Sequence, residues 1–263
     1  MGMGMGMGIY SFVVDQLDRK YPNVALVLRT AKYRLKSSAE MSVMRQYVNG
    51  GDLVLDIGAR RGLFTAYLLN LVGKRGSVEA FEPFPPNVTA LTVLFTKKEN
   101  VKIHPIALSS VEHEAQFVVQ LEHGRPNTAL GSLEHTGASG ETVTISVPCR
   151  RLDNVMAARS RRISFIKCDV EGHELAVAQG GEALIAKDRP VVLMEIEQRH
   201  TKDPIASRFD FFLSRGYTAY FITADRSIRP IKEFSVDKYQ RIGHRDYANM
   251  FLFLPESDVV QTH

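Results

Sequence analysis

The stretch from Leu53 to Thr65 constrains the fold of this chain more than any other. It begins with Leu-Val-Leu-Asp-Ile, an almost continuous apolar run that predicts a buried strand in a parallel sheet covered on both faces. Gly58 and Gly62 then indicate a tight turn, and an amphipathic helix is expected from Leu63. Glycines in such a turn let a ligand approach the backbone, and the helix start offers free N–H groups. The stretch therefore predicts a nucleotide-like ligand at the carboxyl end of this strand.

The spacing of the two glycines separates two classes of nucleotide site. Dinucleotide-binding turns read Gly-x-Gly-x-x-Gly, because the second glycine brings the backbone close to a pyrophosphate. Arg60 stands at that position, which disfavours a NAD-dependent oxidoreductase. The turn instead resembles the first motif of S-adenosylmethionine (SAM)-dependent methyltransferases. An ordinary strand, turn and helix without a ligand is the alternative interpretation.

The composition indicates one globular domain. The chain has 263 residues, of which 44% are hydrophobic and 24% charged. We set aside the Met-Gly repeat at 1–8 as disordered, and expect a single domain over 9–263, with a helical cap at about 9–50 and a core at about 51–256. No stretch reaches membrane-spanning length and no signal segment is visible, so we expect a cytoplasmic protein. The two cysteines, Cys149 and Cys168, form no disulfide framework, which favours a reducing compartment.

The net charge of +4 and the isoelectric point near 9.0 permit nucleic-acid binding without requiring it. Basic residues are dispersed, apart from Arg150–Arg151 and Arg159–Arg162, and aromatic residues are not interleaved with them. We therefore expect a solvated basic surface and no nucleic-acid partner.

Strand and helix patterns alternate along the chain, which predicts a doubly wound, mostly parallel sheet of about seven strands with an antiparallel last strand. Two further strands, at 115–121 and 142–148, should form a small antiparallel insertion around a long polar loop at 123–140. The segment 225–246 reads as irregular. We expect strands at 53–57, 78–81, 101–104, 163–168, 190–196, 217–223 and 249–254, and helices at 9–20, 24–36 and 40–48, from 63 and from 86, and at 174–186 and 205–215.

Glu82 and Pro83 follow the second of these strands, and Glu82 lies 24 residues after Gly58. A carboxylate at the end of the next parallel strand can accept hydrogen bonds from both hydroxyls of a ribose. The alternative role for Glu82 is to cap the helix that follows. The small-residue segment 105–110, after the third strand, could line an adenine pocket with its backbone groups and with Ser109.

Five segments together resemble the FkbM family of SAM-dependent O-methyltransferases, over about residues 40–254. They are Asp56-Ile-Gly-Ala, Glu82-Pro83, Ala107-Leu108-Ser109, Asp169-Val-Glu-Gly-His-Glu and Arg189-Pro190 with Glu195. The family usually has Gly-Ala-Asn-x-Gly in the first turn, whereas this chain has Arg60 and Arg61, so Arg60 either contacts the methionine carboxylate or points outward. The resemblance implies a Rossmann-like class I fold and SAM as cofactor. It places SAM on Asp56, Gly58, Ala59, Arg60, Gly62, Phe64, Thr65, Glu82, Pro83, Leu108, Ser109 and Asp169.

The same resemblance implies methyl transfer to a carbohydrate hydroxyl, with the 1-hydroxyl of a 3-O-methylated mannoside as one candidate acceptor. Another glycosylated natural product or a lipid is the nearest alternative. An RNA methyltransferase, a NAD-dependent oxidoreductase and an inactive SAM-binding module are the competing classes, and the Asp-Val-Glu-Gly segment stands where nucleic-acid methyltransferases would carry a Pro-Pro-Tyr-type motif. A homodimer is a further expectation.

Methyl transfer to a hydroxyl needs a general base or a metal to remove the proton. Asp169 follows the fourth parallel strand, and Glu195 and Glu197 end the fifth, on the same side of the pleat. Oxygen-only ligands suit Mg²⁺, so we expect Asp169 and Glu197 to hold Mg²⁺, with Glu195 as a weaker third ligand. The alternative is that Glu171 or Glu174 caps a helix and Glu195 pairs with an arginine.

Two histidines, His173 and His200, are the better-placed candidates for the base, and the pattern does not choose between them. The expected catalytic residues are therefore Asp169, His173, His200 and Glu197. His123 and His135, in the polar loop, are weaker candidates. We expect that loop, 123–140, and the segment 225–246 to flank the acceptor site.

Overall fold

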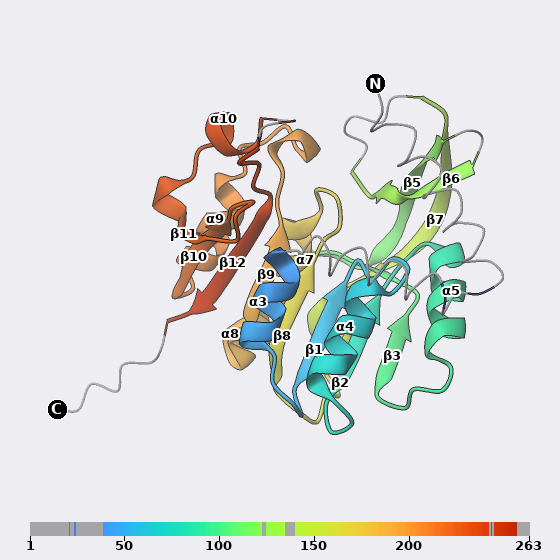
Figure 1. Ribbon diagram of the computed structural model, residues 1–263. Coiled ribbons are helices and arrows are strands. Elements are labelled where there is room, and N and C mark those ends of the chain that lie inside the picture. The colour runs from blue at the N-terminus through green and yellow to red at the C-terminus, as the bar shows by residue number, and fades with distance from the viewer. Residues whose placement is uncertain are drawn as a thin grey trace.

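The structure is a computed structural model that describes residues 21, 24, 39–122, 125–134, 140–241, 243 and 245–256 (Figure 1). The Met-Gly repeat and nearly all of the two helices expected over 9–20 and 24–36 lie outside the described residues, as do His123 and His135.

The main sheet carries eight strands in the described part of the chain, in the order β11-β10-β12-β9-β8-β1-β2-β3. Strands β1, β2, β3, β8 and β9 pair in parallel, whereas β12 runs antiparallel between β9 and β10. This confirms the predicted mixed α/β fold with an antiparallel last strand. The strands are β1 Leu53–Ile57, β2 Ser77–Phe81, β3 Val101–His104, β8 Ile163–Cys168, β9 Val191–Glu195, β10 Tyr217–Ile222, β11 Ile228–Pro230 and β12 Met250–Pro255. The short β11 lies in the segment that we expected to be irregular.

Helices cover both faces of this sheet, which explains why all five residues of β1 are buried. Val54 packs on the face covered by α3 and α4, and Leu55 packs on the opposite face, with α7, α8 and α9. In Figure 1, α3 and α4 lie in front of the sheet. The helices are α3 Ala39–Tyr47, α4 Leu63–Val72, α5 Pro85–Phe95, α6 Leu152–Val155, α7 Glu174–Gly180, α8 Glu182–Asp188, α9 Ala206–Leu213 and α10 Val236–Tyr239, with 3-10 turns η1 Gln198–His200 and η2 Ile231–Glu233.

The single helix expected over 174–186 is wrong, because the chain breaks into α7 and α8 at Gly180 and Gly181. A Cβ on Gly180 would lie 2.1 Å from the carbonyl oxygen of Ser109. The glycine therefore lets α7 approach the segment after β3 closely.

A second sheet, β4-β7-β5-β6, stands beside the carboxyl ends of β1 and β2 (Figure 1). Its strands are β4 Ala107–Leu108, β5 His113–Glu122, β6 Arg125–Ser132 and β7 Thr142–Arg150. The prediction of a loop throughout 123–140 is wrong, because β6 pairs with β5 as an edge strand. Pro126 and Gly131 favour turns, but an edge strand tolerates both. Gly131 is required here, since a Cβ would lie 2.6 Å from the Phe117 ring.

The first turn and the end of β8 meet at Gly58. Its φ of 79° lies in the left-handed region, and a Cβ there would lie 1.9 Å from the backbone oxygen of Asp169. The backbone N–H of Asp169 also donates a hydrogen bond to the Ile57 carbonyl, at 3.1 Å. Gly58 is therefore demanded by the packing of one loop on another, before any ligand is considered.

Replacing Gly58 by Ala should lower the free energy of unfolding by more than about 3 kcal/mol, because backbone strain and a steric clash add. Gly51 is the matched control. Its φ is 98°, but nothing lies within 4 Å of its added Cβ, so Gly51→Ala should cost about 1 kcal/mol. Urea unfolding measures both variants, and equal losses would show that the contact with Asp169 is unimportant.

Asp188, at the end of α8, anchors the start of β8. Its two oxygens accept hydrogen bonds from Arg159 Nε at 2.8 Å and Nη2 at 2.9 Å, and Oδ2 also accepts one from the backbone N–H of Ile163. Although burial alone would raise the pKa of Asp188, the hydrogen bonds from Arg159 and Ile163 lower it below its usual value. The ion pair of Asp188 with Arg159 therefore fixes the start of β8, the strand that ends just before Asp169.

Because the folded-state pKa of Asp188 is depressed, its stabilisation is complete above the unfolded pKa of about 4 and is lost as the pH falls through the folded value. Asp188→Asn should therefore cost about 2 to 3 kcal/mol at pH 7, and its deficit relative to the unmodified protein should shrink below pH ~4. Asp210→Asn, on the exposed side of α9, is the control and should change stability by less than about 0.5 kcal/mol. Denaturant unfolding at several pH values makes the comparison. A deficit that stays constant down to pH ~2 would contradict the assignment.

Candidate cofactor and active site

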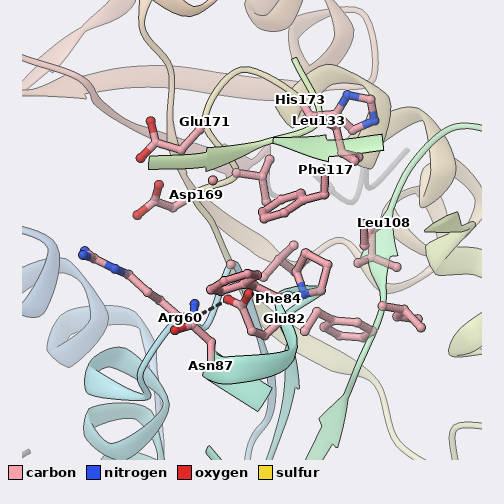
Figure 2. A pocket seen from close by; sticks show the side chains of 18 of the residues that line it. Arg60, Glu82, Phe84, Asn87, Leu108, Phe117, Leu133, Asp169, Glu171 and His173 are labelled. Carbon is pink, nitrogen blue, oxygen red and sulfur yellow. Dashed lines mark hydrogen bonds between the residues drawn. The ribbon is translucent and has the colours of Figure 1, made fainter. Parts of the chain in front are cut away.

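A cleft opens at the carboxyl ends of β1 and β2, between the main sheet and the second sheet (Figure 2). It encloses about 760 Å³, its open mouth included. Of the residues expected from the sequence, seven line it: Gly58, Arg60, Glu82, Pro83, Leu108, Asp169 and His173. The two sheets together therefore form the walls.

Glu82 is a buried carboxylate in the wall of the cleft. Only 4% of its surface is exposed, and its carboxylate accepts hydrogen bonds from the backbone N–H groups of Arg60, at 2.8 Å, and Phe84, at 2.9 Å. Burial raises the pKa of Glu82, while these hydrogen bonds and one from the Asn87 side chain oppose the shift. Glu82 therefore ties the first turn to the start of α5, and it does so at the cleft wall.

Arg60 occupies the place of the second glycine of a dinucleotide turn. Its φ of 51° is in the left-handed region, which is uncommon for a residue with a side chain. This conformation accompanies the hydrogen bond from its N–H to Glu82. Its guanidinium extends along the side of the cleft where Asp169 lies (Figure 2), and its charge contributes to lowering the pKa of Asp169.

The wall opposite Glu82 is apolar and comes largely from the second sheet. Phe117 of β5, Leu133 after β6 and Leu108 of β4 line the cleft together with Phe84 (Figure 2), and Val119 of β5 also lines it. The Phe84 and Phe117 rings stack on each other, with their centroids 6.3 Å apart. None of the β5 and β6 residues belongs to a recognisable motif, so the sequence did not indicate them. An apolar slot beside one buried carboxylate suits a nucleoside, whose base is planar and whose ribose carries hydroxyls.

Asp56 lies beneath the cleft and does not line it. It is fully buried, accepts a hydrogen bond of 2.6 Å from Thr65 Oγ1, and lies 3.7 Å from Lys167 Nζ. Lys167 also approaches Asp169 at 3.3 Å. Although burial alone would lower the pKa of Lys167, Asp169 and Asp56 raise it above its usual value. The lone lysine within the apolar run Ile-Ser-Phe-Ile-Lys-Cys was the available signal for this group.

Several other expected cofactor residues support the turn from outside the cleft. Ala59 and Gly62 pack toward α5, where a Cβ on Gly62 would lie 2.9 Å from Leu91 and Phe95. The Phe64 ring lies 4.9 Å from Lys167 Nζ.

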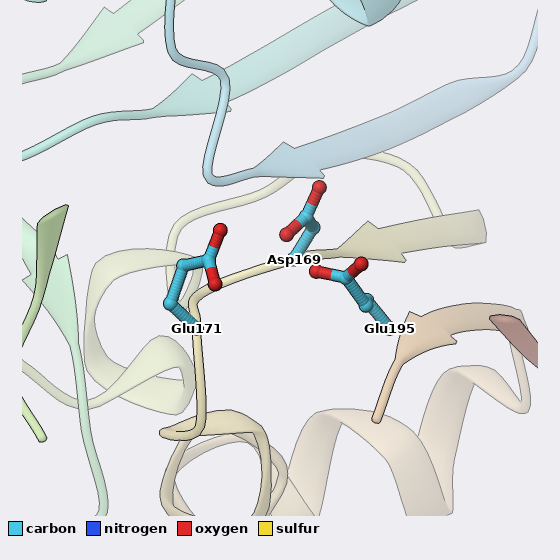
Figure 3. A group of neighbouring side chains, drawn as sticks. All are labelled: Asp169, Glu171 and Glu195. Carbon is cyan, nitrogen blue, oxygen red and sulfur yellow. The ribbon is translucent and has the colours of Figure 1, made fainter. Parts of the chain in front are cut away.

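Asp169, Glu171 and Glu195 form the acidic end of the site (Figure 3). Each offers a carboxylate oxygen, and the three oxygens lie within 4.8 Å of one another. Burial, with the charge of Asp169, raises the pKa of Glu195 well above its usual value and that of Glu171 to about 7. Burial would also raise the pKa of Asp169, but Lys167 and a hydrogen bond with Glu195 lower it.

Glu197 does not join this group. The turn η1 brings Arg199 back onto its carboxylate, which also accepts hydrogen bonds from the Tyr247 hydroxyl and from Asn249 Nδ2, at 2.9 Å. These partners lower the pKa of Glu197 against the effect of burial. Asn249 also donates to Glu195. The structure therefore does not bring Asp169 and Glu197 together as the expected metal ligands. The carboxylates near Asp169 are those of Glu171 and Glu195.

The two candidate bases differ in their surroundings. His173 lines the cleft, with Nδ1 2.7 Å from Glu134 Oε1 and Nε2 3.0 Å from Ser109 Oγ. His200 Nε2 lies 3.3 Å from Glu171 Oε2, and burial lowers the pKa of His200. Both ring nitrogens of His173 are therefore engaged by the protein, whereas His200 faces the acidic group.

Glu174 and the segment 225–246 also have observed roles. Glu174, the first residue of α7, accepts a hydrogen bond of 2.9 Å from the N–H of Gly172, which lies before the helix. Gln240, after α10, bonds the Ile196 carbonyl at 2.6 Å and the Gln198 N–H at 2.7 Å. The segment therefore supports the chain that carries Glu197.

The comparisons with known proteins match this chain to one methyltransferase family. The model of the methyltransferase FkbM domain matches residues 56–219, more than half of the chain. The structure of an FkbM methyltransferase from Methylobacillus flagellatus KT aligns with 95% of this chain and 60% of its own, at 14% identity and a TM-score of 0.50. The present chain thus spans about 60% of that protein.

Other solved structures align less well. A putative rRNA methylase from Clostridium thermocellum aligns with 83% of this chain and 95% of its own, at 10% identity and a TM-score of 0.46. Aeropyrum pernix fibrillarin with natively bound S-adenosyl-L-methionine aligns with 78% of this chain and 68% of its own, at 14% identity and a TM-score of 0.41. A search of curated proteins gave no significant match.

The described helices are all too short or too polar to cross a membrane. The sheet order, the acidic end of β2 and the family match agree on one class of protein. The chain belongs to the FkbM methyltransferase family.

Proposed function

We propose that this protein transfers a methyl group from SAM to a hydroxyl of a carbohydrate. Family membership implies SAM as the methyl donor. The observation that carries the proposal is Glu82, a buried carboxylate held at the cleft wall by the backbone of Arg60 and Phe84.

The cleft suits SAM along its whole length. Each oxygen of Glu82 accepts one backbone N–H, and a carboxylate has about four acceptor positions, so capacity remains for ribose hydroxyls. The adenine would lie in the apolar part of the cleft, against the stacked rings of Phe84 and Phe117. The methionine part would then extend past Gly58 toward Asp169, which directs the methyl group to the acidic end.

Carboxylates at that end are suited to hold a sugar, because they accept hydrogen bonds from its hydroxyls. We propose the 1-hydroxyl of a 3-O-methylated mannoside as the acceptor, with other glycosides and lipids as the alternatives to be tested. An RNA acceptor has less support, because the cluster Arg159–Arg162 bonds its own chain: Arg159 bonds Asp188, and Arg161 bonds the Gly51 and Arg75 carbonyls.

The donor set of the acidic end also fits Mg²⁺, which prefers oxygen ligands. The carboxyl groups of three residues lie close together there, those of Asp169, Glu171 and Glu195. Lys167 contacts one of them, Asp169. Asp169 and Glu195 would hold the ion together with Glu171, and the ion would lower the pKa of the acceptor hydroxyl. Glu197, a ligand in the sequence-based prediction, would position Asn249 instead.

The proton of the acceptor hydroxyl needs a base within reach of the acidic end. His200 lies beside Glu171, whereas Glu134 and Ser109 engage both nitrogens of His173. We therefore assign the base role to His200 and a positioning role to His173.

Glu82→Gln should weaken binding of S-adenosylhomocysteine (SAH) at least about tenfold, because an amide supplies one acceptor oxygen fewer and turns a donor toward the ribose. Glu79→Gln is the matched control, since Glu79 lies in the same strand and bonds His104 outside the cleft. Isothermal titration calorimetry measures both variants, after circular dichroism has shown that they fold. Unchanged affinity of Glu82→Gln would refute the ribose assignment.

Labelled SAM incubated with a panel of sugars, methylated sugars and RNA should transfer label to a 3-O-methylated mannoside. EDTA should abolish this turnover and added Mg²⁺ should restore it, while SAH still binds. Label in RNA alone would refute the carbohydrate acceptor. Full turnover in EDTA would refute the metal and leave methyl transfer with a metal-free base.

A further inference from the structure

Asn87 carries a buried polar atom that has no hydrogen-bond partner among the described residues. It is the third residue of α5, is only 2% exposed, and lines the cleft beside Glu82 (Figure 2). Within the described residues, its Oδ1 is one of three buried side-chain oxygens without a hydrogen bond. Leaving such an oxygen unpaired costs about 1–3 kcal/mol, so in a native protein it usually bonds an ordered water or a ligand.

The orientation of this amide follows from its neighbour. The Asn87 side chain hydrogen-bonds the carboxylate of Glu82, and an ionised carboxylate only accepts hydrogen bonds. The Nδ2 group must therefore face Glu82, because only this group can donate. Oδ1 is then left as an acceptor beside the cleft.

Backbone donors at this end of the cleft are already used. Pro85 and Pro86, which begin α5, have no N–H. The N–H groups of Asn87 and Val88 both donate to the Phe84 carbonyl, at 2.9 and 3.0 Å. Those of Arg60 and Phe84 donate to Glu82. Among the described residues beside Glu82, the groups that remain to bond a ligand are therefore two acceptors, Glu82 and Asn87 Oδ1.

We propose that Asn87 Oδ1 accepts a hydrogen bond from one ribose hydroxyl of the cofactor while Glu82 accepts the other, so that the pair selects nucleosides with both the 2′- and 3′-hydroxyls free. A neighbouring pair of hydroxyls supplies the two donors that two adjacent acceptors need. A phosphate on either position would bring further acceptors against a carboxylate, with no backbone donor left for it. This inference rests on the proposed function, in which SAM occupies the cleft.

The test is a thermodynamic cycle in which the Asn87 side chain and one ribose hydroxyl of the ligand are removed separately and then together. SAH, 2′-deoxy-SAH and 3′-deoxy-SAH are titrated into the unmodified protein and into Asn87→Leu, a variant of similar volume without polar atoms. Asn154→Leu is the matched control, because Asn154 Nδ2 also donates to a carboxylate, Glu112, at 2.8 Å, but at an exposed position. Circular dichroism and thermal unfolding confirm the fold of each variant.

The unmodified protein should bind each deoxy analogue about tenfold more weakly than SAH. Asn87→Leu should bind SAH about tenfold more weakly than the unmodified protein does. It should bind one of the two analogues as tightly as the unmodified protein does, because the hydroxyl that Asn87 binds is already missing from that analogue. Asn154→Leu should match the unmodified protein throughout.

Two failures are distinguishable. If the unmodified protein does not bind SAH, the proposed function fails, and this inference fails with it. If SAH binds but Asn87→Leu loses the same factor for SAH and for both analogues, only the ribose contact of Asn87 is refuted. The deoxy analogues also test the unmodified protein alone, since equal affinity for all three ligands would refute the contact even if Asn87→Leu did not fold.

Discussion

A buried lysine between two aspartates underlies the arrangement of this site. Lys167 lies 3.7 Å from Asp56 of β1 and 3.3 Å from Asp169 after β8, and its Nζ is 3.4 Å from the Gly58 carbonyl. A single charged group would be costly at such depth, but a lysine between two carboxylates is compensated. The ends of two neighbouring strands are therefore held together by charge as well as by backbone hydrogen bonds, and the cleft opens directly above them.

The strands could be predicted from the sequence because their patterns are local. The apolar runs of β1 and β8 and the single glutamate at the end of β2 identified the sheet and the side of the sheet that carries the cleft. The partners of individual side chains could not be predicted in the same way. Glu197 illustrates this, because its carboxylate bonds Arg199 of the turn η1 and also Tyr247 and Asn249, which lie about 50 residues later, just before β12.

Within the second sheet, β5 and β7 match the two strands predicted at 115–121 and 142–148, and β6 was the main omission. β6 contains the residues of a turn, and only its pairing with β5 makes it a strand. It nevertheless reaches the loop after β8, where Ser132 Oγ donates to the Glu171 carbonyl at 2.7 Å and Glu134 bonds His173. The insertion thus contributes both an apolar wall and supports for the acidic loop. A Rossmann-like core without this insertion would lack that wall.

The order of strands also has a consequence for how the protein folds. β1 pairs on one side with β2, which follows it closely, and on the other with β8, where Leu53 meets Ile163. Closing so long a segment is entropically costly, so the second pairing contributes non-local contacts of the kind that slow folding. Gly58 meets Asp169 only once that pairing exists. A nascent chain that has emerged only as far as β7 cannot yet possess the site, however well its first three strands are formed.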